Sequence, residues 1–155
     1  MLSVNTESWC VMKRCYRVVA GVMIKDDKIL CGKRGKGFFE SKWEFPGGKI
    51  ELKETKTEAL RREIKEELNC EIDRCVFFTT TEVEYSEFII HMDTFLISTF
   101  AETPVSDIHQ ELKWEEIGNL CYYDWCDADR KVVSELMKYG ADDLHDMLEA
   151  NEMPM

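Results

Sequence analysis

A long hydrophobic run is missing from this sequence. The longest early apolar stretch, residues 18–24, is far shorter than the roughly 20 apolar residues that a membrane-spanning helix requires. It also lies too far into the chain, and lacks the flanking pattern, to act as a signal peptide. These absences predict a cytoplasmic protein that does not associate with a membrane.

The sequence also lacks any Cys-x-x-Cys pair, and its three histidines are scattered. This distribution argues against a zinc site. Six of the seven cysteines form three pairs separated by four residues. We interpret the cysteines as free thiols that serve as small apolar residues, which fits a reducing compartment better than an oxidising one.

Positive charge is scarce, with 20 lysines and arginines against 31 acidic residues and a net charge of −11. Such a surface repels a polyanion, so we expect no nucleic-acid polymer as a partner. A small anionic ligand stays open, because a bound divalent cation can reverse the local field. The length of 155 residues and the 45% hydrophobic content predict a packed single domain, residues 1–155.

Apolar periodicity predicts strands that alternate with two main helices. The expected strands cover 17–24, 28–33, 71–83, 88–100 and 111–114, and the expected helices cover 55–68, 127–139 and, shorter and acidic, 142–150. Asn69 is expected to end the first helix in a left-handed conformation. These elements predict an α+β fold, an α/β/α sandwich with a mixed β-sheet between helices. Residues 1–14 and 140–155 are expected to be extensions of the domain.

Three glutamates crowd one turn of the first predicted helix, beside its apolar stripe. Glu63, Glu66 and Glu67 stand at positions i, i+3 and i+4, where like charges destabilise a helix. A divalent cation would relieve this repulsion, and oxygen ligands suit Mg²⁺ or Mn²⁺. On the helix alone, a solvated acidic edge paired with neighbouring basic side chains is an open alternative.

The residues around these glutamates resemble a family motif. Residues 48–54, followed after seven residues by 62–70, resemble the Nudix box G-x5-E-x7-R-E-U-x-E-E-x-G-U, where U is a bulky aliphatic residue. Two positions depart from the box, because Asn69 replaces its last glycine and Cys70 its last aliphatic residue. Residues 43–51, 109–114 and 127–133 resemble segments of MutT-like nucleoside triphosphate pyrophosphohydrolases, including those acting on cytidine triphosphate. The resemblance covers roughly residues 16–138.

The resemblance implies roles for the residues of the box. Glu63, Glu66 and Glu67 would be catalytic and bind Mg²⁺, with a backbone carbonyl of Gly47 or Gly48 as a further ligand. Arg62 would orient a carboxylate, and Glu54 would pair with Arg62 as structural support. The implied reaction is substitution of water at phosphorus.

Two residues outside the box are expected to bind substrate. Arg34 is a candidate phosphate ligand, because guanidinium geometry matches phosphate; an exposed hairpin arginine is the alternative. Asp129 aligns with a base-contacting position of the MutT-like enzymes, and a helix-dipole charge is the alternative. The proton acceptor stays open, since Ile108 stands where related enzymes carry a glutamate and either Asp107 or Glu111 would have to substitute.

Other side chains near these segments are interpreted as packing residues. Phe38, Phe39 and Trp43 are candidates for stacking on a base, but packing is the favoured interpretation. His91 and His109 are interpreted as structural.

The expected function is Mg²⁺-dependent hydrolysis of (deoxy)nucleoside triphosphates to a monophosphate and pyrophosphate, with cytidine or modified nucleotides as the favoured substrates. Hydrolysis of ADP-ribose or dinucleoside polyphosphates is an alternative. A non-catalytic nucleotide sensor is a third, which the intact box glutamates disfavour. The sequence leaves open whether the protein is a monomer or a homodimer.

Overall fold

The computed structural model describes residues 13–100 and 102–150. Its elements follow the chain as β1 (Arg14–Lys25), β2 (Lys28–Arg34), β3 (Trp43–Glu44), β4 (Gly47–Lys49), α2 (Lys56–Leu68), β5 (Ile72–Glu84), β6 (Phe88–Phe100), β7 (His109–Glu116), the 3₁₀ helix η1 (Ile117–Tyr122), α3 (Asp127–Leu136) and α4 (Ala141–Ala150). Residues 1–12 of the expected N-terminal extension and 151–155 of the C-terminal one lie outside the described residues.

The strands of the described residues form a mixed sheet. Its main order is β3-β2-β1-β6-β5, with β4 also paired to β1 and β7 to β2. β1 runs parallel to β6, whereas the other pairs are antiparallel. The predicted mixed sheet is therefore confirmed.

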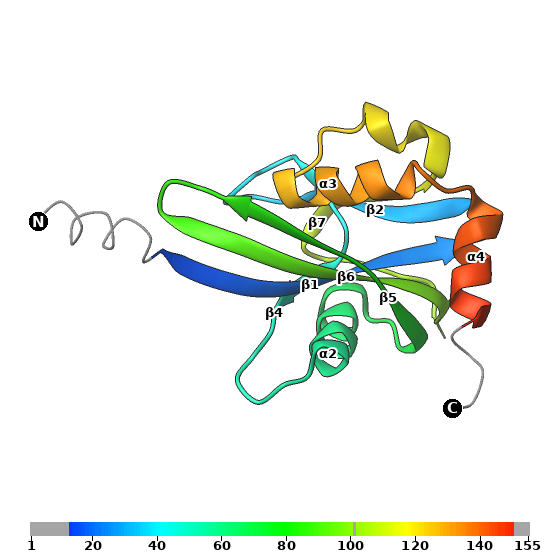
Figure 1. The fold of residues 1–155 in the computed structure, drawn as a ribbon, viewed down its shortest axis with the longest axis horizontal. Helices are drawn as coiled ribbons and strands as arrows, with labels where there is room; N and C mark the ends of the chain where they lie inside the picture. Colours follow the sequence, from blue (N-terminus) through cyan, green and yellow to red (C-terminus); the bar gives the residue numbers. More distant parts are fainter. Residues whose placement is uncertain (1–12, 101, 151–155) are drawn as a thin grey trace, which may run out of the picture.

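Helices cover both faces of this sheet (Figure 1). α2 packs on one face, and α3 and α4 pack on the other. Along β1, Val19 and Met23 point to the α2 side, whereas Ala20, Val22 and Ile24 point to the α3 side. This alternation is the two-residue period of a strand buried on both faces, and it confirms the expected sandwich.

Both ends of α2 are fixed by local hydrogen bonds. Thr55 and Glu58 form a reciprocal capping box at the start of the helix. At the other end Asn69 adopts a left-handed conformation, with φ of 52°, and its N–H donates to the carbonyl of Lys65. The predicted role of Asn69 is confirmed, and both ends of the helix that carries the box glutamates are capped.

Several predicted boundaries were wrong. The strand expected to begin at residue 17 begins at Arg14, because residues 14–16 pair with residues 88–90 of β6. β7 is longer than predicted at both ends, and the helix expected to run to residue 139 ends at Leu136. The short strands β3 and β4 were not predicted, since pairing with distant strands defines them.

The cysteines and the C-terminal helix contribute to packing. Cys31 and Cys70 are fully buried, and each cysteine within the described residues is a free thiol. Cys31, Cys70 and Cys126 are buried, as their interpretation as small apolar residues predicts, whereas Cys15 and Cys121 are exposed and do not fit it. In α4, Leu144 and Leu148 are buried in the core on the α3 side.

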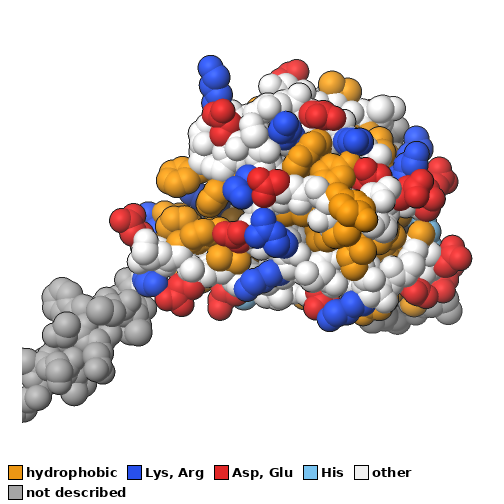
Figure 2. Space-filling view, turned by 90° about the horizontal axis from the view of Figure 1, so that it is seen from above, with side chains coloured by type: hydrophobic (Ala, Val, Ile, Leu, Met, Phe, Trp, Pro, Cys, Tyr) orange, Lys and Arg blue, Asp and Glu red, His pale blue; other side chains and the backbone are white. Residues whose placement is uncertain are grey.

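The face that carries α3 and η1 has a mixed surface. Seen from above, hydrophobic side chains gather near its centre and charged side chains surround them (Figure 2). Tyr122 at the end of η1 and Met137 directly after α3 are exposed apolar side chains on this face. None of the helices in residues 13–100 and 102–150 is long and apolar enough to span a membrane.

Candidate active site

The three box glutamates of α2 differ in burial. Glu67 is 8% exposed, the side chain of Glu63 is 16% exposed, and that of Glu66 is 59% exposed. Both carboxylate oxygens of Glu67 lie 3.4 Å from the N–H of Gly47. The helix therefore presents a graded set of carboxylates, from one in the interior to one in solvent.

Burial perturbs the two inner carboxyl groups. It raises the pKa of Glu67 to about 9, and the negative charge of Glu44 adds to the effect. Burial also raises the pKa of Glu63, even though a hydrogen bond from Arg62 acts in the opposite direction. Negative charge at this place is costly without a cation.

Arg62 ties the loop before α2 to these carboxylates. Its Nε and Nη2 donate to the two carboxylate oxygens of Glu54, at 2.7 and 2.9 Å. Its Nη1 donates to Glu63 at 2.8 Å and to Glu66 at 3.3 Å. The hydrogen bonds from Arg62 hold the pKa of Glu54 at about 2. The expected Glu54–Arg62 pair is therefore present.

Gly47 and Gly48 lie in β4, which is squeezed between β1 and α2. A Cβ at Gly47 would come within 2.0 Å of the carbonyl oxygen of Val19, and a Cβ at Gly48 within 2.4 Å of the carboxyl carbon of Glu63. Only glycine permits this approach. Gly47 thus lets β4 lie close to the backbone of β1, and Gly48 leaves room for the carboxylate of Glu63.

A cavity of about 170 Å³ opens beside this arrangement. It is bounded by residues of β1, by 44–48, by the start of α3 and by the aromatic rings of Phe39 and Tyr85. The two ring centroids are 5.8 Å apart. Its lining contains three ionisable residues, Arg34, Glu44 and Asp129, in an otherwise apolar setting.

Asp129 is 6% exposed and lies at the start of α3. Its Oδ1 accepts a hydrogen bond from the N–H of Phe45 at 2.9 Å. Burial raises its pKa to about 8, with a further contribution from the charge of Glu44. At neutral pH the group therefore carries a proton and can donate as well as accept a hydrogen bond.

Arg34 reaches the same cavity from the end of β2. Its Nη1 donates to Oε1 of Glu44 at 2.7 Å, and its Nε donates to the carbonyl of Phe38 at 2.9 Å. A guanidinium has five N–H donors, so these two bonds leave capacity for a phosphate.

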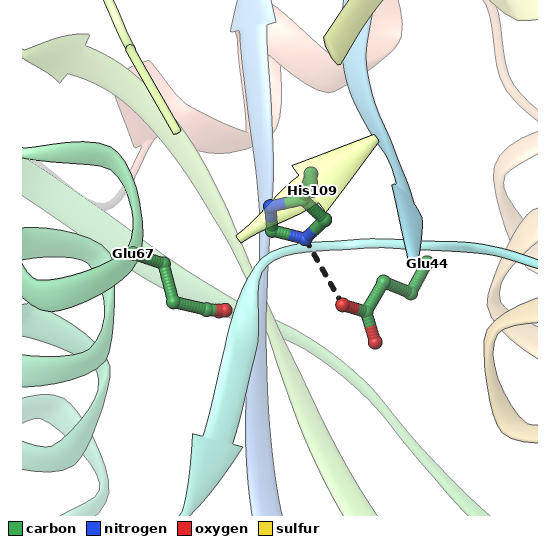
Figure 3. Close-up of side chains that lie close together, drawn as sticks. All are labelled: Glu44, Glu67 and His109. Atoms are coloured by element: carbon green, nitrogen blue, oxygen red, sulfur yellow. Dashed lines mark hydrogen bonds and ion pairs between the residues drawn. The ribbon is translucent and has the colours of Figure 1, made fainter. Parts of the chain in front are cut away.

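Sequence reasoning missed two residues that the fold brings to this place. Glu44 was noted only as part of a motif, and His109 was interpreted as structural. One ligating atom from each, together with one from Glu67, lie within 4.8 Å of one another. In Figure 3, Glu67 reaches from α2 toward the hydrogen-bonded pair of Glu44 and His109. The available signal was an acidic residue inside the apolar run 43–45.

The other sequence candidates lie elsewhere. Asp107, Ile108 and Glu111 are exposed, and they are not among the residues that line the cavity. Of the three aromatic candidates, Phe39 lines the cavity, Phe38 is exposed and Trp43 packs on Tyr123.

Comparison with known proteins gives one consistent family. The model of the NUDIX domain matches residues 16–143. The chain is 31% identical to an 8-oxo-dGTP diphosphatase of Buchnera aphidicola over 78% of this chain and 92% of that protein. It is 32% identical to a CTP pyrophosphohydrolase of Escherichia coli, over 83% of this chain and 96% of that protein.

The solved structure of the E. coli ORF135 protein is similar as well. The two folds superpose with a TM-score of 0.74 at 31% identity, covering 81% of this chain and 91% of that chain. The family match extends over most of the sequence and includes the box glutamates and the strands beside them. The chain therefore belongs to the Nudix family and is a hydrolase of phosphorus-containing anhydrides.

Proposed function

We propose that this protein is a Mg²⁺-dependent pyrophosphohydrolase of nucleoside triphosphates. Water and the triphosphate would yield a nucleoside monophosphate and pyrophosphate. One observation carries the proposal: Gly47 and Gly48, which lie against Glu67 and Glu63, line a cavity that the buried carboxyl group of Asp129 also lines. The names of the two relatives, a diphosphatase of 8-oxo-dGTP and a pyrophosphohydrolase of CTP, support a triphosphate substrate.

The donor set fits a divalent cation. Glu63, Glu66 and Glu67 offer only oxygen, which suits Mg²⁺ or Mn²⁺. The raised pKa of the buried Glu67 means that its ionised form is unfavourable unless a positive partner is bound. These three residues, with a carbonyl of Gly47 or Gly48, would hold the ion. When bound, Mg²⁺ would neutralise the diphosphate and activate the attacking water.

The protein's own residues would organise the substrate around this site. Arg62 holds Glu63 and Glu66 by hydrogen bonds, and Glu54 in turn holds Arg62. Arg34 would bind a phosphate oxygen, because its guanidinium reaches the cavity. A glutamate of the box would accept the proton of the water; Asp107 and Glu111, which do not line the cavity, are the alternative acceptors.

Base recognition is assigned to Asp129. A carboxyl group with a pKa of about 8 can donate to a ring carbonyl or accept from an exocyclic amine. Both groups occur together on cytosine, which is consistent with a cytidine nucleotide, and a modified deoxynucleotide presents comparable groups. Phe39 and Tyr85, on the wall of the same cavity, are placed to contact the flat faces of a base.

The test is product analysis on a panel of nucleotides with and without Mg²⁺. The panel contains ribo- and deoxynucleoside triphosphates, 8-oxo-dGTP, ADP-ribose and a dinucleoside polyphosphate. Mg²⁺-dependent release of pyrophosphate and monophosphate from triphosphates is expected, led by cytidine or modified nucleotides. Turnover of ADP-ribose or dinucleoside polyphosphates alone would contradict the substrate class, and binding without turnover would indicate a nucleotide sensor.

A further inference from the structure

The ring of His109 bridges two strands inside the protein. Its side chain is 2% exposed, and a Cβ atom at Gly32 would come within 2.7 Å of the ring. Glycine at this position of β2 therefore lets the ring reach from β7 to β3. Nδ1 lies 2.8 Å from Oγ of Ser106, and Nε2 lies 3.0 Å from Oε2 of Glu44 (Figure 3).

The hydrogen bonds of Ser106 determine the tautomer of this ring. Oγ of Ser106 accepts from the N–H of Ile108 at 3.2 Å and from the N–H of His109 at 3.1 Å. A hydroxyl oxygen has two lone pairs, so both are used and the hydroxyl hydrogen is left to donate to Nδ1. Nδ1 is then an acceptor, and the ring proton resides on Nε2, which donates to Glu44.

This assignment explains the close approach of His109, Glu44 and Glu67. Because Nε2 carries a hydrogen, it has no lone pair for a metal ion. The grouping is therefore a hydrogen-bonded arrangement beside the proposed metal site, and His109 is not a ligand in it.

Glu44 connects His109 to Arg34 through hydrogen bonds. Its Oε2 accepts from His109 and its Oε1 accepts from Nη1 of Arg34 at 2.7 Å. The carboxylate is thus held at both oxygens, and it can turn only if one bond breaks. The second bond of Arg34, from Nε to the carbonyl of Phe38, fixes the plane of the guanidinium.

We propose that Ser106, His109 and Glu44 are positioning residues that hold Arg34 in place for a substrate phosphate. The chain of bonds starts in the loop before β7 and ends at the cavity. This inference rests on the proposed function, because the phosphate belongs to the nucleotide substrate. A long side chain that is already held in place loses less conformational freedom when it binds a ligand. This chain of hydrogen bonds, called the relay below, therefore acts on substrate affinity more than on the chemical step.

Steady-state kinetics on the full chain with Mg²⁺ test this. His109→Ala is expected to raise KM for the best triphosphate by about tenfold or more, with kcat changed by less than about threefold. His109→Gln places an N–H near the position of Nε2 and is expected to restore most of the affinity. His91→Ala is the control, because the Nδ1 atom of His91 also lies near a carboxylate, 3.3 Å from Oε1 of Glu82 on β5, and His91 does not line the cavity.

A binding experiment separates the relay from the proposed function. The probe is inorganic pyrophosphate with Mg²⁺, titrated by calorimetry into the wild type, His109→Ala, Arg34→Ala and His91→Ala. Weaker pyrophosphate binding in His109→Ala and Arg34→Ala, but not in His91→Ala, supports the relay even if no triphosphate is hydrolysed. An active wild type with equal KM in His109→Ala and His91→Ala overturns the relay and leaves the proposed function standing. A wild type that neither binds pyrophosphate nor hydrolyses triphosphates overturns both.

A spectroscopic signature is independent of turnover. The chain has three histidines, so imidazole ¹⁵N spectra can be assigned by comparison with His109→Gln. We expect protonated Nε2 and unprotonated Nδ1 in His109. The opposite tautomer, or a cationic ring, would overturn the assignment. Ser106→Ala removes the hydroxyl that contacts Nδ1, and it is expected to change this signature and to raise KM in the same direction as His109→Ala.

Discussion

In the proposed metal site, the buried carboxyl group of Glu67 is expected to couple metal binding to pH. Burial, and then the charge of Glu44, raise its pKa to about 9. At pH 7 the metal-free protein therefore holds a proton on Glu67. Removing it costs roughly 3 kcal/mol, because each unit between pH and pKa corresponds to a little over 1 kcal/mol. A cation that binds the carboxylate must displace this proton.

The apparent dissociation constant for Mg²⁺ is expected to fall by up to about tenfold for each unit between pH 7 and 9, and then to level off. The sign follows from the raised pKa, since the protonated form of Glu67 predominates below about 9. Titration calorimetry at each pH, in two buffers of different ionisation enthalpy, gives both the affinity and the number of protons released. Close to one proton is expected at pH 7.

Glu66→Gln is the matched control for this experiment, because the Glu66 side chain is 59% exposed. It should weaken metal binding and keep the pH dependence. Glu67→Gln should weaken binding and abolish the pH dependence. Equal wild-type affinity at pH 7 and pH 9, without proton release, would refute the reasoning.

Asp129 and Gly48 give three further tests. Asp129→Ala is expected to change the ranking of kcat/KM among bases more than the maximal rate on the best substrate; a uniform loss across bases would argue against base contact. The pKa of Asp129 is about 8 in the folded protein and about 4 in a model peptide. Between these pH values the folded protein holds a proton on Asp129 that the unfolded chain has lost. The free energy of unfolding therefore falls as pH rises, by up to about 1.4 kcal/mol per unit. Thermal unfolding of metal-free Asp129→Asn should lack this slope, and parallel curves for the variant and the wild type would contradict it. Gly48→Ala would place a methyl group 2.4 Å from the carboxyl carbon of Glu63. Activity should therefore fall by at least about tenfold, with the circular dichroism spectrum retained. Gly118→Ala is the control and should behave as wild type, because the space around Gly118 is open.

Local signals in the sequence predicted the elements that local forces define. The apolar stripe and capping residues placed the helix of residues 56–68 within one residue at its start, and Asn69 ends it as expected. The long strands β5 and β6 followed from their apolar patterns, with boundaries within one residue. The box motif also placed Glu63, Glu66 and Arg62 on one side of that helix, where hydrogen bonds join them.

The parts of the site that depend on contacts between distant segments could not be predicted from the sequence. Glu44 meets His109 only because β3 and β7 flank β2, with Gly32 opposite Glu44. No periodicity marks a strand of two residues such as Trp43–Glu44. The depth of Asp129 likewise depends on the packing of α3 over the sheet, and an acidic residue in the first turn of a helix is normally read as a surface charge.

The most direct test of the central claim is the rate of pyrophosphate release from the best triphosphate substrate by the wild type, Glu66→Gln and Glu67→Gln. Each protein is first shown to be folded by circular dichroism, and each is assayed with and without Mg²⁺. We expect Mg²⁺-dependent release by the wild type and a rate at least about 100-fold lower in each variant, because each substitution removes a proposed carboxylate ligand of the catalytic ion. Wild-type rates in the folded variants would contradict it.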